Sequence, residues 1–139
     1  MSFALRAATI DDVDGLLELW QEAAENAGRP ADTRQAVTAL LGRDPEALIL
    51  AEQDGHLIGS VIAGWDGWRC HLYRLAVRPD WRRKGVASAL LRAAEDRFRG
   101  LRASRADAMV LDANDLGQNL WGASGYSRQD DWRRWVKTL

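Results

Sequence analysis

Apolar residues near the N-terminus of this 139-residue chain recur at three- and four-residue steps, the period of an amphipathic helix. A helix is therefore predicted from Ile10 to about Ala27, opened by a capping box of Thr9 and Asp12. A short extended run, residues 3–7, precedes it. A shorter amphipathic helix is predicted to begin at Asp32 and to end near Gly42.

The middle of the chain changes to strand patterns separated by turn dipeptides. Strands are predicted over Ala47–Glu52 and Leu57–Trp65, joined by the tight turn Asp54-Gly55. A second Asp-Gly pair at 66–67 is expected to lead into a strand from Trp68 to Val77. The pattern predicts a three-stranded antiparallel meander.

Pro79 ends the third of these strands because proline cannot donate a ladder hydrogen bond. A helix is predicted from Gly85 to about Phe98, with Gly100 as its C-terminal cap. A strand follows over 108–111, whose consecutive apolar residues are typical of a strand covered on both faces. A helix over 114–124 and a closing strand over 132–136 complete an α/β fold with a mixed central β-sheet flanked by helices.

Composition narrows the class of protein. The chain is 47% hydrophobic and 28% charged, which predicts one soluble globular domain over residues 1–139. Its 19 basic and 20 acidic residues give a net charge of -1, which argues against nucleic acid as a partner. The single cysteine, Cys70, excludes an internal disulfide and a multi-cysteine metal site, so no metal is expected. Without an export signal or a membrane-spanning run, a cytoplasmic location with no membrane partner is expected.

The chemically informative segment, 75–91, runs from a strand end through a basic turn into a helix. The first amides of a helix lack intrahelical acceptors and carry positive partial charge, so a helix start can hold a diphosphate. Gly85 lets a ligand approach the backbone closely, and Arg82, Arg83 and Lys84 add formal positive charge. The segment therefore predicts an anion-binding corner.

The spacing Arg82-x-x-Gly85-x-Ala87 resembles the pyrophosphate-binding signature of the GNAT superfamily of acyl-CoA-dependent N-acetyltransferases. A second segment resembles the family's "Asn … Phe-Tyr … Gly-Phe" pattern with every interval kept, through Asn114, Leu120, Trp121, Gly125 and Tyr126. The resemblance covers the C-terminal two-thirds of the chain. It implies two splayed strands at the donor site and acetyl-CoA as the donor.

The resemblance also implies which residues hold acetyl-CoA. The backbone of 75–77 is expected to pair with the pantetheine arm like an added strand, and the amides of 83–88 to cradle the diphosphate. Asn114 is expected to contact pantetheine, and Trp121 to wall the thioester pocket. The expected cofactor-binding residues are Leu75, Ala76, Val77, Arg82, Arg83, Lys84, Gly85, Val86, Ala87, Ser88, Asn114 and Trp121.

Acetylation of an amine requires a base, because alkyl amines have a pKa of ~10.4 and arrive protonated. Imidazole, with a reference pKa of ~6.5, suits this role, and the chain has two histidines, His56 and His71. His56 belongs to a hairpin. His71 is expected on the same strand face as Tyr73 unless a bulge changes its face, and its strand resembles that of arylalkylamine N-acetyltransferases, which have histidine at both positions. Asp66 is a rival base, although Asp-Gly is favoured as a turn.

The leaving thiolate is protonated by a tyrosine in many members of the family, and Trp121 occupies the matching position here. An indole N–H donates a hydrogen bond but is not a practical acid at neutral pH. Tyr126, Tyr73 or water are the remaining donors. Because a thiol has a pKa of ~8.5, the CoA thiolate is also able to leave as the anion, without a proton donor.

The tryptophans offer a site for a cationic acceptor. Trp65, Trp68 and Trp20, beside a carboxylate, are candidates for cation–π binding of an amine, with core packing as the alternative. Trp132 and Trp135 are candidates for a sheet-edge or homodimer contact.

Two functions remain open. The first is an N-acetyltransferase that uses acetyl-CoA to acetylate a small amine or a protein amino group by direct attack in a ternary complex. The alternative is an acyl-CoA-binding regulatory module with little turnover, which the tryptophan at position 121 makes conceivable.

Overall fold

The computed structural model describes residues 2–23 and 31–139, which form two compact units, Met1–Met109 and Val110–Leu139. The elements of the first unit are β1 (Ala4–Ala7), the 3-10 turn η1 (Ile10–Asp12), α1 (Val13–Ala23), α2 (Arg34–Arg43), β2 (Leu48–Gln53), β3 (His56–Trp65), β4 (Cys70–Val77), η2 (Pro79–Trp81), α3 (Val86–Gly100) and β5 (Ala106–Ala108). The second unit contains α4 (Asp115–Ala123). The predicted end of the first helix at Ala27 lies outside the described residues. No described helix is long and apolar enough to cross a bilayer.

The five strands form one sheet in the order β1-β2-β3-β4-β5. Neighbours from β1 to β4 pair antiparallel, whereas β4 and β5 pair parallel. The predicted mixed sheet and its antiparallel meander are thus confirmed. The local turn signals account for the meander, and α3 supplies the crossover that a parallel pair requires.

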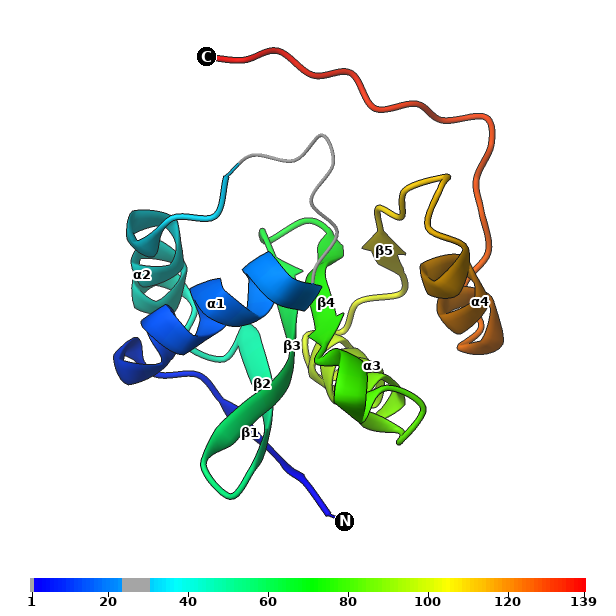
Figure 1. The fold of residues 1–139 in the computed structure, drawn as a ribbon. Coiled ribbons are helices and arrows are strands. Elements are labelled where there is room, and N and C mark those ends of the chain that lie inside the picture. Colours follow the sequence, from blue (N-terminus) through cyan, green and yellow to red (C-terminus); the bar gives the residue numbers. More distant parts are fainter. Residues whose placement is uncertain (1, 24–30) are drawn as a thin grey trace. The chain divides into compact units, whose positions relative to one another are not determined.

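Helices cover both faces of this sheet, as two adjacent residues of β3 show. The Ser60 side chain reaches Trp20 of α1, while a Cβ at Gly59 would lie 3.0 Å from Val86 of α3. Because successive strand residues point to opposite faces, α1 and α3 lie on opposite sides of the sheet (Figure 1). The core on the α1 side includes α2 and is built from Ala8, Val13, Leu16, Leu19, Trp20, Val37, Leu48, Leu50 and Ala76.

The two hairpin connections differ from each other. Asp54 and Gly55 both have positive φ, 50° and 79°, which fits the predicted tight turn. The second connection is a four-residue loop, and β4 begins at Cys70 instead of the predicted Trp68. In this loop the Asp66 carboxylate accepts the backbone N–H groups of Trp68 and Arg69, both at 2.7 Å. These two contacts hold the pKa of Asp66 below its usual range.

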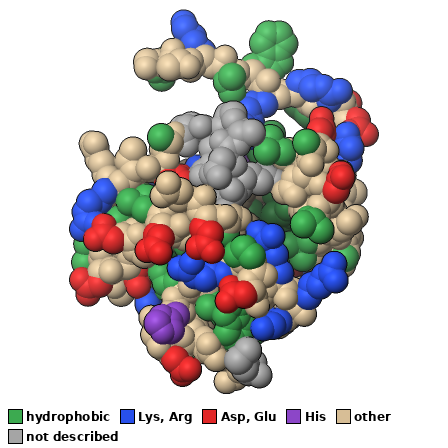
Figure 2. All heavy atoms as spheres, in the orientation of Figure 1, with side chains coloured by type: hydrophobic (Ala, Val, Ile, Leu, Met, Phe, Trp, Pro, Cys, Tyr) green, Lys and Arg blue, Asp and Glu red, His purple; other side chains and the backbone are tan. Residues whose placement is uncertain are grey.

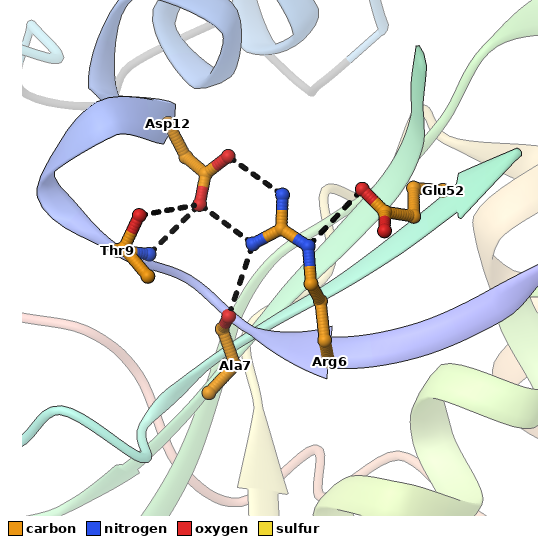
Figure 3. Close-up of polar contacts among 5 residues, drawn as sticks. All are labelled: Arg6, Ala7, Thr9, Asp12 and Glu52. Carbon is orange, nitrogen blue, oxygen red and sulfur yellow. Dashed lines mark hydrogen bonds and ion pairs between the residues drawn. The ribbon is translucent and has the colours of Figure 1, made fainter. Parts of the chain in front are cut away.

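The first helical segment begins as its capping box predicts. The Asp12 carboxylate accepts the Thr9 backbone N–H at 2.8 Å and also binds the Arg6 guanidinium through two hydrogen bonds of 2.8 Å (Figure 3). Arg6 in turn pairs with Glu52 of β2 at 3.1 Å. Arg6 therefore ties β1 to both the helix start and its neighbouring strand, and its hydrogen bonds to the carboxylate lower the pKa of Asp12.

The start of α2 corrects one prediction. Its N-cap is Thr33, whose hydroxyl accepts the Ala36 N–H at 3.1 Å, and not Asp32. Asp32 instead binds Arg74 of β4 through a tertiary ion pair at 2.7 Å. At the end of α3, Gly100 is still helical, and the left-handed residue is Arg102 (φ 63°), two positions after the predicted cap.

The C-terminal predictions are right for the helix and wrong for the strands. α4 has Asn114 as its N-cap and Ser124 as its C-cap, as expected. β5 is Ala106–Ala108 instead of 108–111, and Met109 and Leu111 are exposed. No strand forms over 132–136, because these residues pair with no described strand and thus lack ladder hydrogen bonds. Trp135 is 94% exposed there, so a contact with a partner copy stays a prediction.

Candidate functional site

The edge of β4 that faces β5 is paired along only part of its length. The parallel register covers Cys70–Leu72, opposite Ala106–Ala108. From Arg74 to Val77 this edge has no ladder partner among the described strands. The predicted segment Leu75, Ala76 and Val77 lies here, so its backbone is free to pair with an extended ligand along this edge.

A bulge interrupts β4 at the start of this edge. Tyr73 pairs with Ile62 and Ala76 with Ser60, so two residues of β4, Arg74 and Leu75, oppose a single residue of β3. Arg74 has φ 51°, in the left-handed region that non-glycine residues rarely adopt. The bulge follows His71 and Tyr73, whose rings lie on one face with centroids 6.0 Å apart, as alternation predicts.

Side chains from three elements hold the bulge in place. The Ser60 hydroxyl donates to the Arg74 carbonyl at 2.8 Å and accepts the Trp20 indole N–H at 2.8 Å. The Arg74 guanidinium binds Asp32 through Nε at 2.9 Å. Sequence reasoning did not identify Ser60, Arg74 or Asp32 as part of the site. A serine within the apolar run 57–63 was the one signal available for Ser60.

The basic corner has the backbone of an anion site. Arg83 and Gly85 both adopt left-handed conformations, with φ 61° and 83°, and α3 begins at Val86. Because the N-cap is a glycine, no side chain caps the amides of Val86, Ala87 and Ser88 in the first turn. Residues 82–85 are exposed.

The cations of the corner differ in their contacts. Lys84 Nζ lies 4.9 Å from the centroid of the Trp81 ring, and that ring is buried. Within the described part of the chain, Arg82 and Arg83 form no ion pair with a carboxylate, so their charge is available to a ligand. On the face seen in Figure 2, basic and acidic side chains are interspersed.

The second unit holds the remaining predicted residues. Asn114 Oδ1 accepts the Gly117 N–H at 2.9 Å and so caps α4. Trp121 and Tyr126 pack edge to face with centroids 4.9 Å apart. These contacts lie within the unit, and the roles of Asn114, Trp121 and Tyr126 toward a ligand stay predictions.

The candidate bases differ in their surroundings. His71 is partly buried on β4 beside Tyr73, whereas His56 is exposed at the start of β3. Asp66 already accepts two backbone amides, and its lowered pKa makes the carboxylate a weaker base. Asp66 therefore has the turn role expected from its sequence, and the role of His71 in proton removal stays a prediction.

A pocket of about 240 Å³ opens between α1, α2, β3 and β4 in the first unit. It is lined by Trp20, Ala31, Asp32, Thr33, Ala36, Val37, Leu40, Ile62, Tyr73 and Arg74. Of the tryptophans considered for acceptor binding, Trp20 is among these residues, whereas Trp68 is 76% exposed on the loop before β4. Trp65 does not line the pocket either.

These features define an α/β protein with a mixed sheet, a partly unpaired strand edge and a basic helix start. The family model of the acetyltransferase (GNAT) family matches residues 13–126. An acetyltransferase of Yersinia pestis (strain Pestoides F) is 32% identical over 121 residues, which cover 86% of this chain and 84% of that protein. The chain therefore belongs to the GNAT family of acetyltransferases.

Solved structures show the same fold at lower identity. Aminoglycoside N-acetyltransferase AAC(6')-Iy in complex with CoA matches with a TM-score of 0.80 and 21% identity, over 99% of this chain and 96% of that one. Ard1 from Thermoplasma volcanium matches with a TM-score of 0.79 and 19% identity, over 91% and 84%. The predicted GNAT-like fold is confirmed.

Proposed function

We propose that this acetyltransferase moves the acetyl group of acetyl-CoA to a primary amine, either a small amine or a protein amino group, by direct attack in a ternary complex. The observation that carries the proposal is the continuity of two features. The unpaired edge 74–77 leads through residues 78–84 to the start of α3 at Gly85, which no side chain caps. An extended arm ending in a diphosphate matches this combination.

The backbone of Leu75, Ala76 and Val77 pairs with the pantetheine arm in this proposal. The amides of 83–88 bind the diphosphate, and the Arg82, Arg83 and Lys84 side chains supply positive charge. The roles of Asn114 and Trp121 toward the donor are proposed from the resemblance to the family, and residues 1–139 are proposed to act as one GNAT domain, since the family match runs over residues 13–126.

In the chemical step, the neutral amine attacks the thioester carbonyl carbon, and a C–N bond forms as the C–S bond breaks. His71 accepts the proton that the amine loses, directly or through water, because its imidazole lies on the exposed side of β4 next to Tyr73. The CoA thiolate leaves as the anion or takes a proton from Tyr73 or Tyr126. Trp121, at the family's tyrosine position, packs against Tyr126 and does not serve as the acid.

That same tryptophan favours one second candidate, an acyl-CoA-binding regulatory module with little turnover. The two functions separate in a paired experiment. Calorimetry with CoA measures binding, and release of free thiol from acetyl-CoA with a panel of amines measures transfer. Binding together with amine-dependent thiol release supports the transferase. Tight binding without release supports the regulatory module, and the absence of binding by folded protein overturns both.

A further inference from the structure

The pocket between α1, α2, β3 and β4 lies next to the proposed chemistry. Tyr73 lines it and directly precedes residues 74–77, the part of β4 that has no ladder partner on the β5 side among the described strands. The Tyr73 ring centroid is 6.0 Å from that of His71, the proposed base. A group held in this pocket would therefore place an attached amine near the proposed base.

The lining of the pocket is mainly apolar. Of the ten lining residues that the structure describes, six carry hydrocarbon or indole side chains: Trp20, Ala31, Ala36, Val37, Leu40 and Ile62. A volume of about 240 Å³ lies below the range of about 300–1,000 Å³ that is typical of pockets for drug-sized ligands. The pocket thus suits one small apolar substituent.

Arg74 neutralises the charge in this pocket. Asp32 is the one carboxylate among the described lining residues, and its side chain is 15% exposed. It binds Arg74 through Nε at 2.9 Å and through a terminal nitrogen at 2.7 Å. The Arg74 guanidinium also lies 6.0 Å from the Trp20 ring centroid. A carboxylate and an indole are the groups expected to attract a cationic acceptor, and here Arg74 contacts both.

We propose that this pocket binds the side group of the acceptor, and that Arg74 restricts the acceptor to a monoamine with one small, uncharged, apolar substituent. A second ammonium group would have to displace Arg74 from Asp32 or lie beside the guanidinium, and both are unfavourable in a half-buried site. Diamines and aminoglycosides are therefore excluded. This inference rests on the proposed function and assigns the specificity of the same site.

The test compares kcat/KM for 3-methylbutylamine, 2-phenylethylamine, 1,4-diaminobutane and neamine, with saturating acetyl-CoA. The wild-type protein is expected to prefer the two monoamines by about tenfold or more. In Arg74→Gln an amide keeps a hydrogen-bond donor near Asp32 but removes the cation. Its kcat/KM for 1,4-diaminobutane is expected to rise about tenfold relative to that for 3-methylbutylamine.

Asp32→Asn is the matched variant, because it removes the opposite charge from the same pair. It leaves the guanidinium uncompensated and is expected to lower kcat/KM for every amine, most of all for the diamine. If the ion pair were only structural, both variants would lower all rates alike. Opposite shifts in the diamine-to-monoamine ratio thus report on charge selection and not on folding.

A wild-type preference for diamine or neamine would overturn the inference, as would an unchanged ratio in Arg74→Gln. Either result would leave the transferase proposal standing, because turnover would have been observed. The failure of the transferase proposal is recognised separately, by the absence of acetyl-CoA binding in calorimetry or by binding without amine-dependent thiol release from any amine.

Discussion

The Ser60 hydroxyl donates a hydrogen bond of 2.8 Å to the carbonyl oxygen of Arg74 and so connects β3 to the bulge of β4. The Ser60 Oγ also accepts the indole N–H of Trp20, which brings α1 into the link. Ser60 is fully buried within the sheet. The Ser60 hydroxyl therefore provides a hydrogen-bond partner for both the Trp20 N–H and the Arg74 carbonyl. Arg74 has φ 51° and lies where β4 bends toward the proposed acetyl-CoA site.

Ser60→Ala is expected to lower the free energy of unfolding by about 2–3 kcal/mol, because it leaves the Trp20 N–H and the Arg74 carbonyl without their partner. Urea unfolding followed by circular dichroism measures the change. Ser127→Ala, at an exposed position, is the control and should change stability by less than about 0.5 kcal/mol. Equal stability of Ser60→Ala and wild type would show that the link contributes nothing.

Gly85→Glu is expected to abolish CoA binding while the fold survives. Position 85 is exposed, and a Cβ there meets no atom within 4 Å, so the side chain fits but places a carboxylate at the uncapped helix start. The left-handed backbone, with φ 83°, costs any side chain about 1–2 kcal/mol. Calorimetry with CoA measures affinity, and a thermal melt checks the fold.

Two matched variants separate charge from strain in this experiment. Gly85→Gln carries the same backbone strain without the negative charge and is expected to bind CoA more weakly than wild type but measurably. Gly42→Glu adds the same carboxylate at an exposed position with equally open space and should bind normally. Wild-type affinity in Gly85→Glu would remove the diphosphate from this corner.

Local patterns in the sequence were sufficient for most of the fold. The capping box at Thr9 and Asp12, the Asp54-Gly55 turn and the cap at Asn114 each depend on residues that are close in the chain. The GNAT signature added the strand edge and basic corner. The capping box, the turn and the helices followed from helix periodicity and turn chemistry, which act over a few residues.

The predictions failed where distant residues compete. Asp32 has the sequence of a helix cap, but a guanidinium 42 positions away binds it, and Thr33 caps α2 instead. The residues of 132–136 resemble a strand, yet a strand also needs a partner, and no local pattern supplies one. The bulge at Arg74 also depends on residues that are distant in the sequence, because it arises from the way β3 and β4 pair.

Asp12→Asn is expected to lower stability at pH 7 by about 1–2 kcal/mol, since the variant loses the charge-assisted hydrogen bonds to Arg6. Arg6 lowers the pKa of Asp12 in the folded state below the value near ~3.9 of an unfolded aspartate. The stabilisation by the carboxylate is therefore complete above that value and is lost as the pH falls through the lowered pKa. Urea midpoints at pH 7, 5 and 3 should show a difference that shrinks only at the lowest pH.

The control for this titration is Asp14→Asn, which removes a carboxylate of similar charge from an exposed ion pair with Arg34. Its side chain is 86% exposed, and its effect at pH 7 should be small because solvent screens such pairs. A constant difference between wild type and Asp12→Asn at every pH would contradict the assignment to the ionised carboxylate.

His71→Ala is expected to slow acetyl transfer more near neutral pH than at high pH. Fewer amine molecules are neutral as the pH falls below their pKa of ~10.4, so the need for a protein base grows in that direction. Without the imidazole, the rate should fall about 10²–10⁴-fold near pH 7, and the deficit should narrow as the pH approaches 10. His56→Ala removes the exposed histidine of the β2–β3 hairpin and should keep the wild-type profile. A profile of His71→Ala parallel to that of the wild type would exclude His71 as the base, and a water chain would then have to deliver the proton to bulk solvent.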